Sequence, residues 1–105
     1  MQIQINSDHN ITGDERLSTY VSSTVEKSLD RFSKRITRME IHFSDENGKK
    51  GGANDKRCML EARISNHAPT SVTHHAPTVK QALVGAISKL EKSLQHTFER
   101  LDHRH

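Results

Sequence analysis

The chain has 105 residues, which predicts one domain with a small core, because about 100–150 residues is the usual domain size. Only 31% of the residues are hydrophobic and the mean hydropathy is −0.80, a composition that disfavours a deep, enclosed active site. Lys and Arg outnumber Asp and Glu by 16 to 13, and there are eight histidines, so we expect a polyanionic partner.

A strand and then a helix are predicted for the first third of the chain. Ile3 and Ile5 alternate with polar residues, which predicts a strand over residues 1–6. Thr12 and Glu15 fit a capping box, in which the hydroxyl and the carboxylate satisfy each other's free backbone amides. Apolar residues then recur at steps of three and four, which predicts an amphipathic helix of about five turns. They are Leu17, Tyr20, Val21, Val25, Leu29, Phe32 and Ile36.

Three strands are predicted next, because the apolar period changes to two. The first carries Met39, Ile41 and Phe43, the second alternates from Cys58 to Ile64, and the third covers residues 70–75 after a turn at 66–69. Residues 45–56 contain three glycines and are predicted to form a flexible loop. Consecutive strands with short connections favour an antiparallel meander.

The last predicted element is a helix that follows Pro77. Thr78 and Gln81 fit a second capping box. Its apolar stripe consists of Leu83, Ala86, Ile87, Leu90, Leu94, Phe98 and Leu101, and residues 102–105 are predicted to be a frayed tail. The fold class is therefore α+β with the order β-α-β-β-β-α. We expect a four-stranded sheet with two helices packed on one face, in a single domain over residues 1–105.

Basic residues follow helical spacing and predict a surface for RNA phosphates. With about 100° per residue, each set forms a stripe roughly opposite the apolar one, and two helices on one side of a sheet would share an outer surface. The first set is Lys27, Arg31, Lys34 and Arg38, with Arg35 beside it. The second is Lys89, Lys92, His96 and Arg100, extended by Lys80. An ordinary solvated face remains the alternative, because Asp30, Glu91 and Glu99 dilute the pattern.

Other features refine the expected mode of binding. Lys56 and Arg57, next to the predicted loop, are candidates for clasping RNA. The aromatic residues fall on core positions, so no platform for base stacking is expected. Recognition should therefore depend on the backbone and shape of folded RNA.

Metal binding and catalysis are not predicted. His74 and His75 are adjacent, so in a strand they point to opposite faces; we expect them, like His42 and His67, to be exposed polar positions. Cys58, the sole cysteine, excludes an internal disulfide, favours a reducing compartment and alternates with inward-facing residues, so it is expected to be buried rather than nucleophilic. We predict a soluble cytoplasmic protein that is not an enzyme and has no cofactor, small-molecule substrate, membrane span or signal peptide.

Several segments together resemble a known family over nearly the whole chain. They are Met1-Gln2-Ile3-Gln4-Ile5, Thr12, Leu17-x-x-Tyr20-Val21, Lys27-x-Leu29-x-Arg31-Phe32, the meander, Ala82-Leu83 and Lys89-Leu90. Their order and spacing are similar to the short form of the ribosome hibernation-promoting factor family, also called ribosome-associated inhibitor or sigma-54 modulation proteins.

The resemblance implies a fold shaped like double-stranded-RNA-binding domains and binding to small-subunit rRNA in the channel for messenger and transfer RNA. It further implies silencing of translation by steric occlusion under stress or in stationary phase, with RNA contacts at Lys27, Arg31, Lys89 and Lys92. The last helix departs from the family's lysine run, since residues 95–100 read Gln-His-Thr-Phe-Glu-Arg, which indicates a divergent branch. We expect the dimerisation domain of long members to be absent. The alternatives are a general structured-RNA-binding protein and a regulatory protein–protein interaction module that uses loop 45–56.

Overall fold

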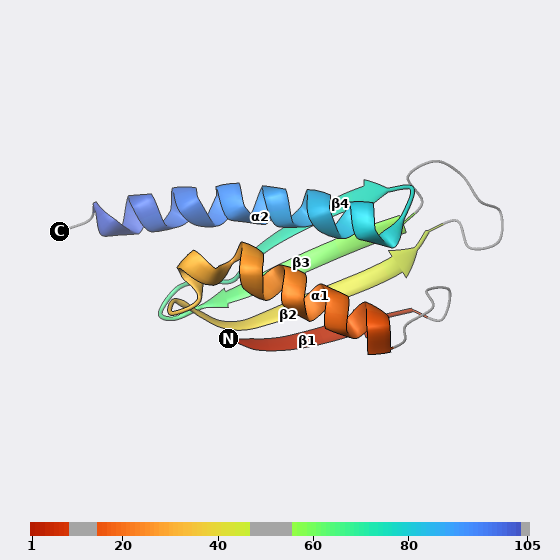
Figure 1. Cartoon of the computed structure of the whole chain (residues 1–105). Helices are drawn as coiled ribbons and strands as arrows, with labels where there is room; N and C mark the ends of the chain where they lie inside the picture. The colour runs from red at the N-terminus through yellow and green to blue at the C-terminus, as the bar shows by residue number, and fades with distance from the viewer. Residues whose placement is uncertain (9–14, 47–55, 104–105) are drawn as a thin grey trace.

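The elements of the chain follow the predicted order (Figure 1). The computed structural model describes residues 1–8, 15–46 and 56–103. Its elements are β1 (Gln2–Ser7), α1 (Glu15–Ser28), the short 3-10 helix η1 (Asp30–Phe32), β2 (Ile36–Asp45), β3 (Lys56–Ile64), β4 (Thr70–Ala76) and α2 (Val79–Asp102). The α+β class and the order β-α-β-β-β-α are therefore confirmed.

The four strands form one sheet in the order β1-β2-β3-β4. Strands β2, β3 and β4 are antiparallel neighbours, which confirms the predicted meander. Strand β1 runs parallel to β2 and pairs Ile3 with Met39 and Ile5 with Ile41. This pairing follows from α1, because a chain that returns through a helix starts its next strand in the same direction.

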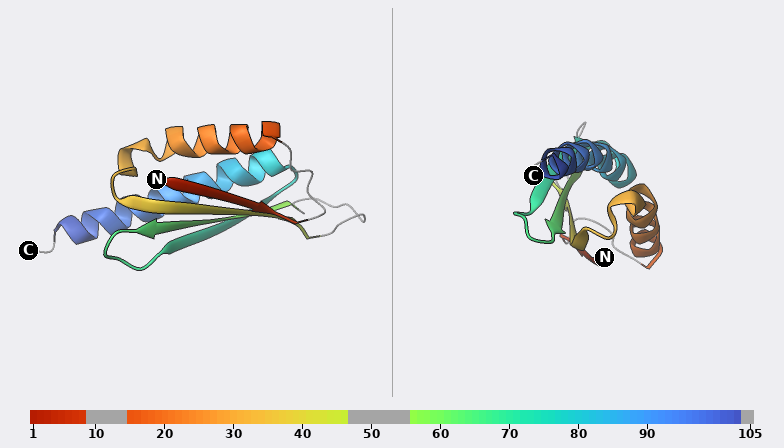
Figure 2. Two further views of the ribbon diagram at one scale, coloured as in Figure 1. Left: turned by 90° about the horizontal axis from the view of Figure 1, so that it is seen from below. Right: turned by 90° about the vertical axis from the view of Figure 1, so that its left-hand side faces the viewer.

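Both helices cover the same face of the sheet, as predicted (Figure 2). Alternate residues of β2 and β3 point into the core between the two layers, and Met39, Ile41 and Leu60 are fully buried there. The helices contribute single stripes, represented by Val25 of α1 and Leu90 of α2, which are also fully buried. The opposite face of the sheet carries polar and charged side chains.

Helix α1 is shorter than predicted. It ends at Ser28, and the chain continues through η1 and a turn before Ile36 begins β2. The apolar pattern misled the prediction because Leu29, Phe32 and Ile36 all remain in the core. The backbone amide of Phe32 donates to the carbonyl of Leu29, and that of Arg35 to the carbonyl of Phe32, so three-residue turns keep the spacing of a helix face.

Helix α2 begins at the predicted cap and packs closely on β4. The hydroxyl of Thr78 accepts a 3.1 Å hydrogen bond from the backbone amide of Gln81, as in a capping box. One turn later, Gly85 lies against the imidazole of His74, and a β-carbon at position 85 would be only 2.1 Å from its Cδ2 atom. His74 is therefore not an exposed position as predicted, but half-buried beneath α2, while His75 faces the other side of the sheet.

Three predicted features fall wholly or partly outside the described residues. Thr12 of the first predicted capping box and residues 47–55 of the predicted loop lie outside them, as do residues 104–105. Asp102, which we predicted to begin a frayed tail, is the last residue of α2. No helix in the described part of the chain is long and apolar enough to cross a bilayer.

Candidate nucleic-acid interface

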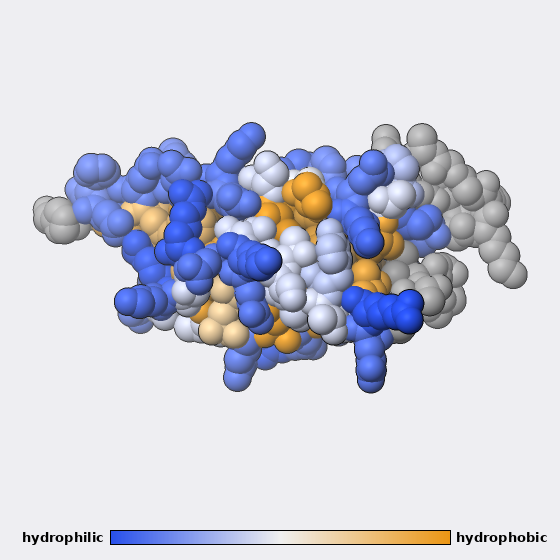
Figure 3. Space-filling view, viewed as in Figure 1, coloured by the Kyte–Doolittle hydropathy of each residue, from blue (hydrophilic) through white to orange (hydrophobic). Residues whose placement is uncertain are grey.

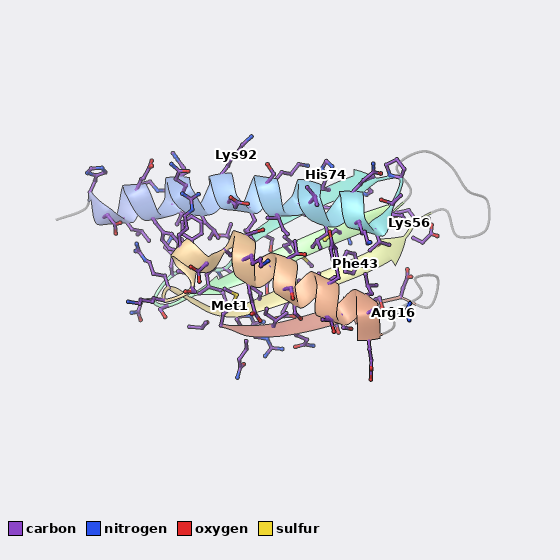
Figure 4. The ribbon with its side chains drawn as sticks, viewed as in Figure 1. Met1, Arg16, Phe43, Lys56, His74 and Lys92 are labelled. Atoms are coloured by element: carbon purple, nitrogen blue, oxygen red, sulfur yellow. The ribbon has the colours of Figure 1, made fainter. Side chains whose placement is uncertain are left out.

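One row of basic residues runs along α2, as predicted. Its members are exposed and follow steps of three, four and four residues, namely Lys89, Lys92, His96 and Arg100. The ammonium group of Lys89 donates a 2.8 Å hydrogen bond to the carbonyl of Thr73. This contact places the row on the flank of α2 next to β4, and Lys92 projects from α2 on the side away from α1 (Figure 4). We call these four residues the α2 row.

A second group of cations lies between η1 and the C-terminal half of α2. The guanidinium carbon of Arg31 is 4.4 Å from the ring centre of Phe32, and that of Arg35 is 4.0 Å from the ring centre of Phe98. The two rings are themselves packed with their centres 5.4 Å apart. Each arginine also contacts α2, since Arg31 donates to the side-chain oxygen of Gln95 at 3.4 Å and Arg35 to Asp102 at 3.1 Å. We call Arg31, Phe32, Arg35 and Phe98 the arginine–phenylalanine cluster.

The predicted first stripe is not a helical stripe, because α1 ends before most of it. Lys27 is exposed in the last turn of α1, Arg31 belongs to η1, and Lys34 is exposed in the following turn. Lys80 lies at the other end of the helix pair, with its ammonium nitrogen 4.9 Å from the ring centre of Tyr20. Lys27 and Lys34 still belong to the helical side of the molecule.

Arg38 was placed on the wrong side of the molecule. It lies on β2 and alternates with buried Met39, so it points from the open face of the sheet, away from the helices. The side chain of Glu40, 15% exposed, lies 3.6 Å from Arg38 and 3.0 Å from Arg63. The same carboxylate is 3.5 Å from His42, which carries charge only when protonated. Arg38 therefore belongs to an ion-pair network and not to the α2 row.

Lys56 and Arg57 are similarly paired with carboxylates. The ammonium group of Lys56 is 3.2 Å from Asp45, and the guanidinium of Arg57 is 3.6 Å from Glu46. Glu46 also lies 3.3 Å from His75 on the open face. Because acids accompany the bases, charge is mixed both on the open face at Arg57 and at the end of β2 and β3 where Lys56 pairs with Asp45, and both places attract phosphates less than the α2 row does.

The helical face is mostly hydrophilic on its outside, with apolar atoms showing in patches along its middle (Figure 3). Tyr20 is half-buried, whereas Phe32 and Phe98 are buried, so no large aromatic platform for unstacked bases is presented by the described residues. The chemistry of this face suits phosphate groups: lysines supply mobile charges, and arginines supply planar donor pairs.

Cys58 has the properties of a core residue. It is fully buried, as predicted, and burial raises the pKa of its thiol from 9.0 to about 12, although the nearby Arg57 acts in the opposite direction. The thiol is therefore protonated at neutral pH and is a poor nucleophile. Elsewhere in the described residues, no group of three or more His, Cys, Asp or Glu side chains is placed to hold a metal ion.

The raised pKa of Cys58 predicts a loss of stability in alkali. Below pH 9 the thiol is protonated in both states, but above pH 9 it ionises first in the unfolded chain, which favours unfolding. This group should lower the free energy of unfolding by about 1.4 kcal/mol per pH unit above that point. Urea unfolding at pH 8, 9 and 10 measures the slope. In the Cys58→Ala variant the free energy of unfolding should fall less steeply with pH. Equal slopes in the two proteins would show that the thiol does not contribute to the loss of stability.

The comparisons with known proteins agree with this geometry. The family described as sigma 54 modulation protein / S30EA ribosomal protein matches residues 3–102. The chain belongs to this family. The S30EA family consists of ribosome-associated factors and is not a known enzyme family. Membership confirms the resemblance seen in the sequence and agrees with ribosome hibernation and translation regulation as the field of action.

Solved structures support the same fold. The N-terminal domain of Protein Y from Thermus thermophilus matches with a TM-score of 0.73 and 16% identity, covering 92% of this chain and 99% of that one. A ribosomal subunit interface protein from Coxiella burnetii gives the same TM-score and identity, with coverage of 94% and 99%. No curated protein matches the sequence significantly.

One part of the site in this S30EA family member was missed from the sequence. Asp102 and Gln95 contact arginines that are more than sixty residues earlier in the chain. A local pattern carries no signal for such a contact, and Asp102 was assigned to a tail. Only the apolar spacing of Phe32 and Phe98 hinted that the two segments would meet.

Proposed function

We propose that this protein binds small-subunit rRNA in the channel for messenger and transfer RNA, and that it silences translation there by steric occlusion under stress or in stationary phase. The family match over residues 3–102 carries this proposal. It is supported by the shared fold of a protein described as a ribosomal subunit interface protein. The protein would act in the cytoplasm, without a cofactor or a chemical step, in a single domain over residues 1–105.

The physical support comes from the helical side of the molecule. Exposed lysines at positions 27, 34, 89 and 92 can exchange with the counterions condensed on a phosphate backbone, and their release favours binding. Phe32 and Phe98 are buried and therefore not accessible for stacking on RNA bases. The surface should instead recognise the shape and backbone of folded RNA. The ion-paired open face would then point away from rRNA.

Co-sedimentation with ribosomes and with separated subunits at two salt concentrations tests the proposal. We expect saturable binding near one copy per small subunit at low salt, and much weaker binding at high salt because fewer counterions are released. A protein that stays in the supernatant with small subunits at low salt would overturn the proposed function.

Two single charge reversals make a matched test of where the RNA lies. Lys92→Glu and Arg16→Glu each change the net charge by the same amount, but Lys92 belongs to the α2 row, whereas Arg16 lies in the first turn of α1 (Figure 4). Lys92→Glu should weaken small-subunit binding roughly tenfold at about 0.1 M salt. It should also make the salt slope, which is the slope of the logarithm of the binding constant against the logarithm of the salt concentration, less steep by about one or more. Arg16→Glu should have a clearly smaller effect. Equal effects would mean that only net charge matters.

A regulatory protein-binding module is the second candidate, favoured by the ion-paired open face of the sheet. Glu40, Arg63 and Arg57 present charges of both signs there, as protein interfaces often do. Such binding should survive Lys92→Glu and fail when residues 47–55 are shortened. A general structured-RNA-binding protein, the other alternative, would bind unrelated hairpins as tightly as small subunits.

A further inference from the structure

The carboxylate of Asp102 lies against Arg35 on the helical side of the molecule. One terminal nitrogen of the Arg35 guanidinium, Nη1, donates to both carboxylate oxygens, at 3.1 and 3.3 Å. The two side chains are 41% and 63% exposed, so a ligand from solvent can reach both. An exposed ion pair of this kind contributes little to stability, because water and salt screen it.

Phe98 holds the guanidinium of Arg35 in a defined place. The ring is 5% exposed, and the guanidinium carbon lies 4.0 Å from its centre. A cation on an aromatic face is attracted by the ring and is restricted in orientation. The donor atoms of Arg35 are thus directed to one acceptor position before any ligand arrives, and Asp102 occupies that position.

Arg31 repeats the arrangement on the neighbouring ring. It lies 4.4 Å from the centre of Phe32, which packs on Phe98, and donates to the neutral side-chain oxygen of Gln95 at 3.4 Å. Two guanidinium groups therefore lie against two phenylalanine rings that pack on each other with their planes tilted by 45°. One of them has a weak neutral acceptor and the other has a charged one.

We propose that Arg31 and Arg35 form a phosphate subsite for RNA, and that Asp102 occupies this subsite in the free protein as a substitute for a phosphate group. The inference rests on the proposed function and goes further by naming where a backbone phosphate is gripped. Guanidinium groups bind carboxylate and phosphate oxygens with the same donor geometry, so one can replace the other without rebuilding the site. Asp102 lowers the affinity for RNA, both by competing for Arg35 and by repelling phosphate.

Two charge-neutralising variants of α2 separate competition from general repulsion. Asp102→Asn and Glu99→Gln each remove one negative charge from the end of the same helix. Glu99 is exposed and accepts a hydrogen bond from Gln95 at 3.1 Å, and among the described side chains no arginine forms an ion pair with it. Affinity is measured by fluorescence anisotropy with an RNA duplex of about 16 base pairs at fixed ionic strength. Asp102→Asn should tighten binding roughly two- to fivefold, and Glu99→Gln clearly less.

The dependence on Arg35 is tested in a second background. Arg35→Gln should weaken duplex binding, and adding Asp102→Asn to it should then give no more than the gain of Glu99→Gln. The inference is overturned if Asp102→Asn and Glu99→Gln tighten binding equally, or if the gain persists without Arg35. It is also overturned if the wild-type protein does not bind the duplex at low salt. Asp102→Ser serves as a second variant, and thermal unfolding of each variant checks that the fold is kept.

Failure of this inference and failure of the proposed function give different results. If small subunits bind one copy of the wild-type protein but Asp102→Asn behaves like Glu99→Gln, the subsite is wrong and the ribosomal role stands. If the duplex results are as expected but small subunits do not bind, the subsite stands and the ribosomal role is wrong.

Discussion

Replacement of Gly85 by alanine is expected to destabilise the protein by about 1–3 kcal/mol, the usual cost of overpacking a core. The new β-carbon would lie 2.1 Å from Cδ2 and 2.6 Å from Cγ of His74, so the whole imidazole must leave its place beneath α2. Thermal or urea unfolding measures the effect. In a domain of this size, 1 kcal/mol corresponds to about 4–8 °C in Tm.

The His74→Ala background supplies the control for this prediction. Without the imidazole, Gly85→Ala should become stabilising by up to about 1 kcal/mol, because alanine favours a helix over glycine. Val84→Ala, at the exposed neighbouring position, should change stability by less than about 0.5 kcal/mol. If Gly85→Ala stabilises the wild-type protein, the imidazole moves freely and the close approach of α2 to β4 does not depend on glycine.

Reversal of both Lys27 and Arg31 to glutamate should reduce binding to small subunits by roughly a hundredfold at about 0.1 M salt. Two phosphate contacts are lost and two repulsive charges replace them, so the salt slope should fall by about two. Co-sedimentation over a series of salt concentrations measures both quantities. Because Arg31 also packs on Phe32, the thermal stability of the variant must be measured in parallel.

The neighbouring acids allow the opposite experiment. Glu26 and Asp30 are exposed beside Lys27 and Arg31, and their joint replacement by lysine adds as much positive charge as the first variant removes. This second variant should bind small subunits more tightly than the wild-type protein. If neither variant changes small-subunit binding, the end of α1 does not contact RNA.

Most of the fold could be predicted from the sequence, because the apolar period changes where the structure changes. Met39, Ile41 and Phe43 alternate on β2, and the stripe around Leu90 follows α2. The end of α1 could not be predicted, since Leu29, Phe32 and Ile36 keep helical spacing while the backbone passes from helix to turn to strand. Periodicity reports which side chains face the core and not which backbone carries them.

The candidate site was predictable only where it is local. The α2 row lies on one continuous helix, so sequence spacing placed it correctly on one flank. The predicted position of Arg38 on the helical side was wrong, because the face on which it lies depends on where β2 begins. A shift of one residue along a strand moves a side chain to the other side of the sheet. The contact of Arg35 with Asp102 depends on the packing of Phe32 against Phe98. Such long-range contacts follow from tertiary structure and not from spacing.

The hydrogen bond from Lys89 to Thr73 also bears on how the protein behaves at high concentration. Strand β4 is an edge of the sheet, and an unpaired edge can recruit a strand from another molecule. The Lys89 ammonium group occupies one backbone acceptor of β4 and brings a positive charge to that edge. A second molecule that paired with β4 would have to displace this group and desolvate its charge. The same lysine that we expect to meet RNA thereby protects the free protein from self-association through its sheet.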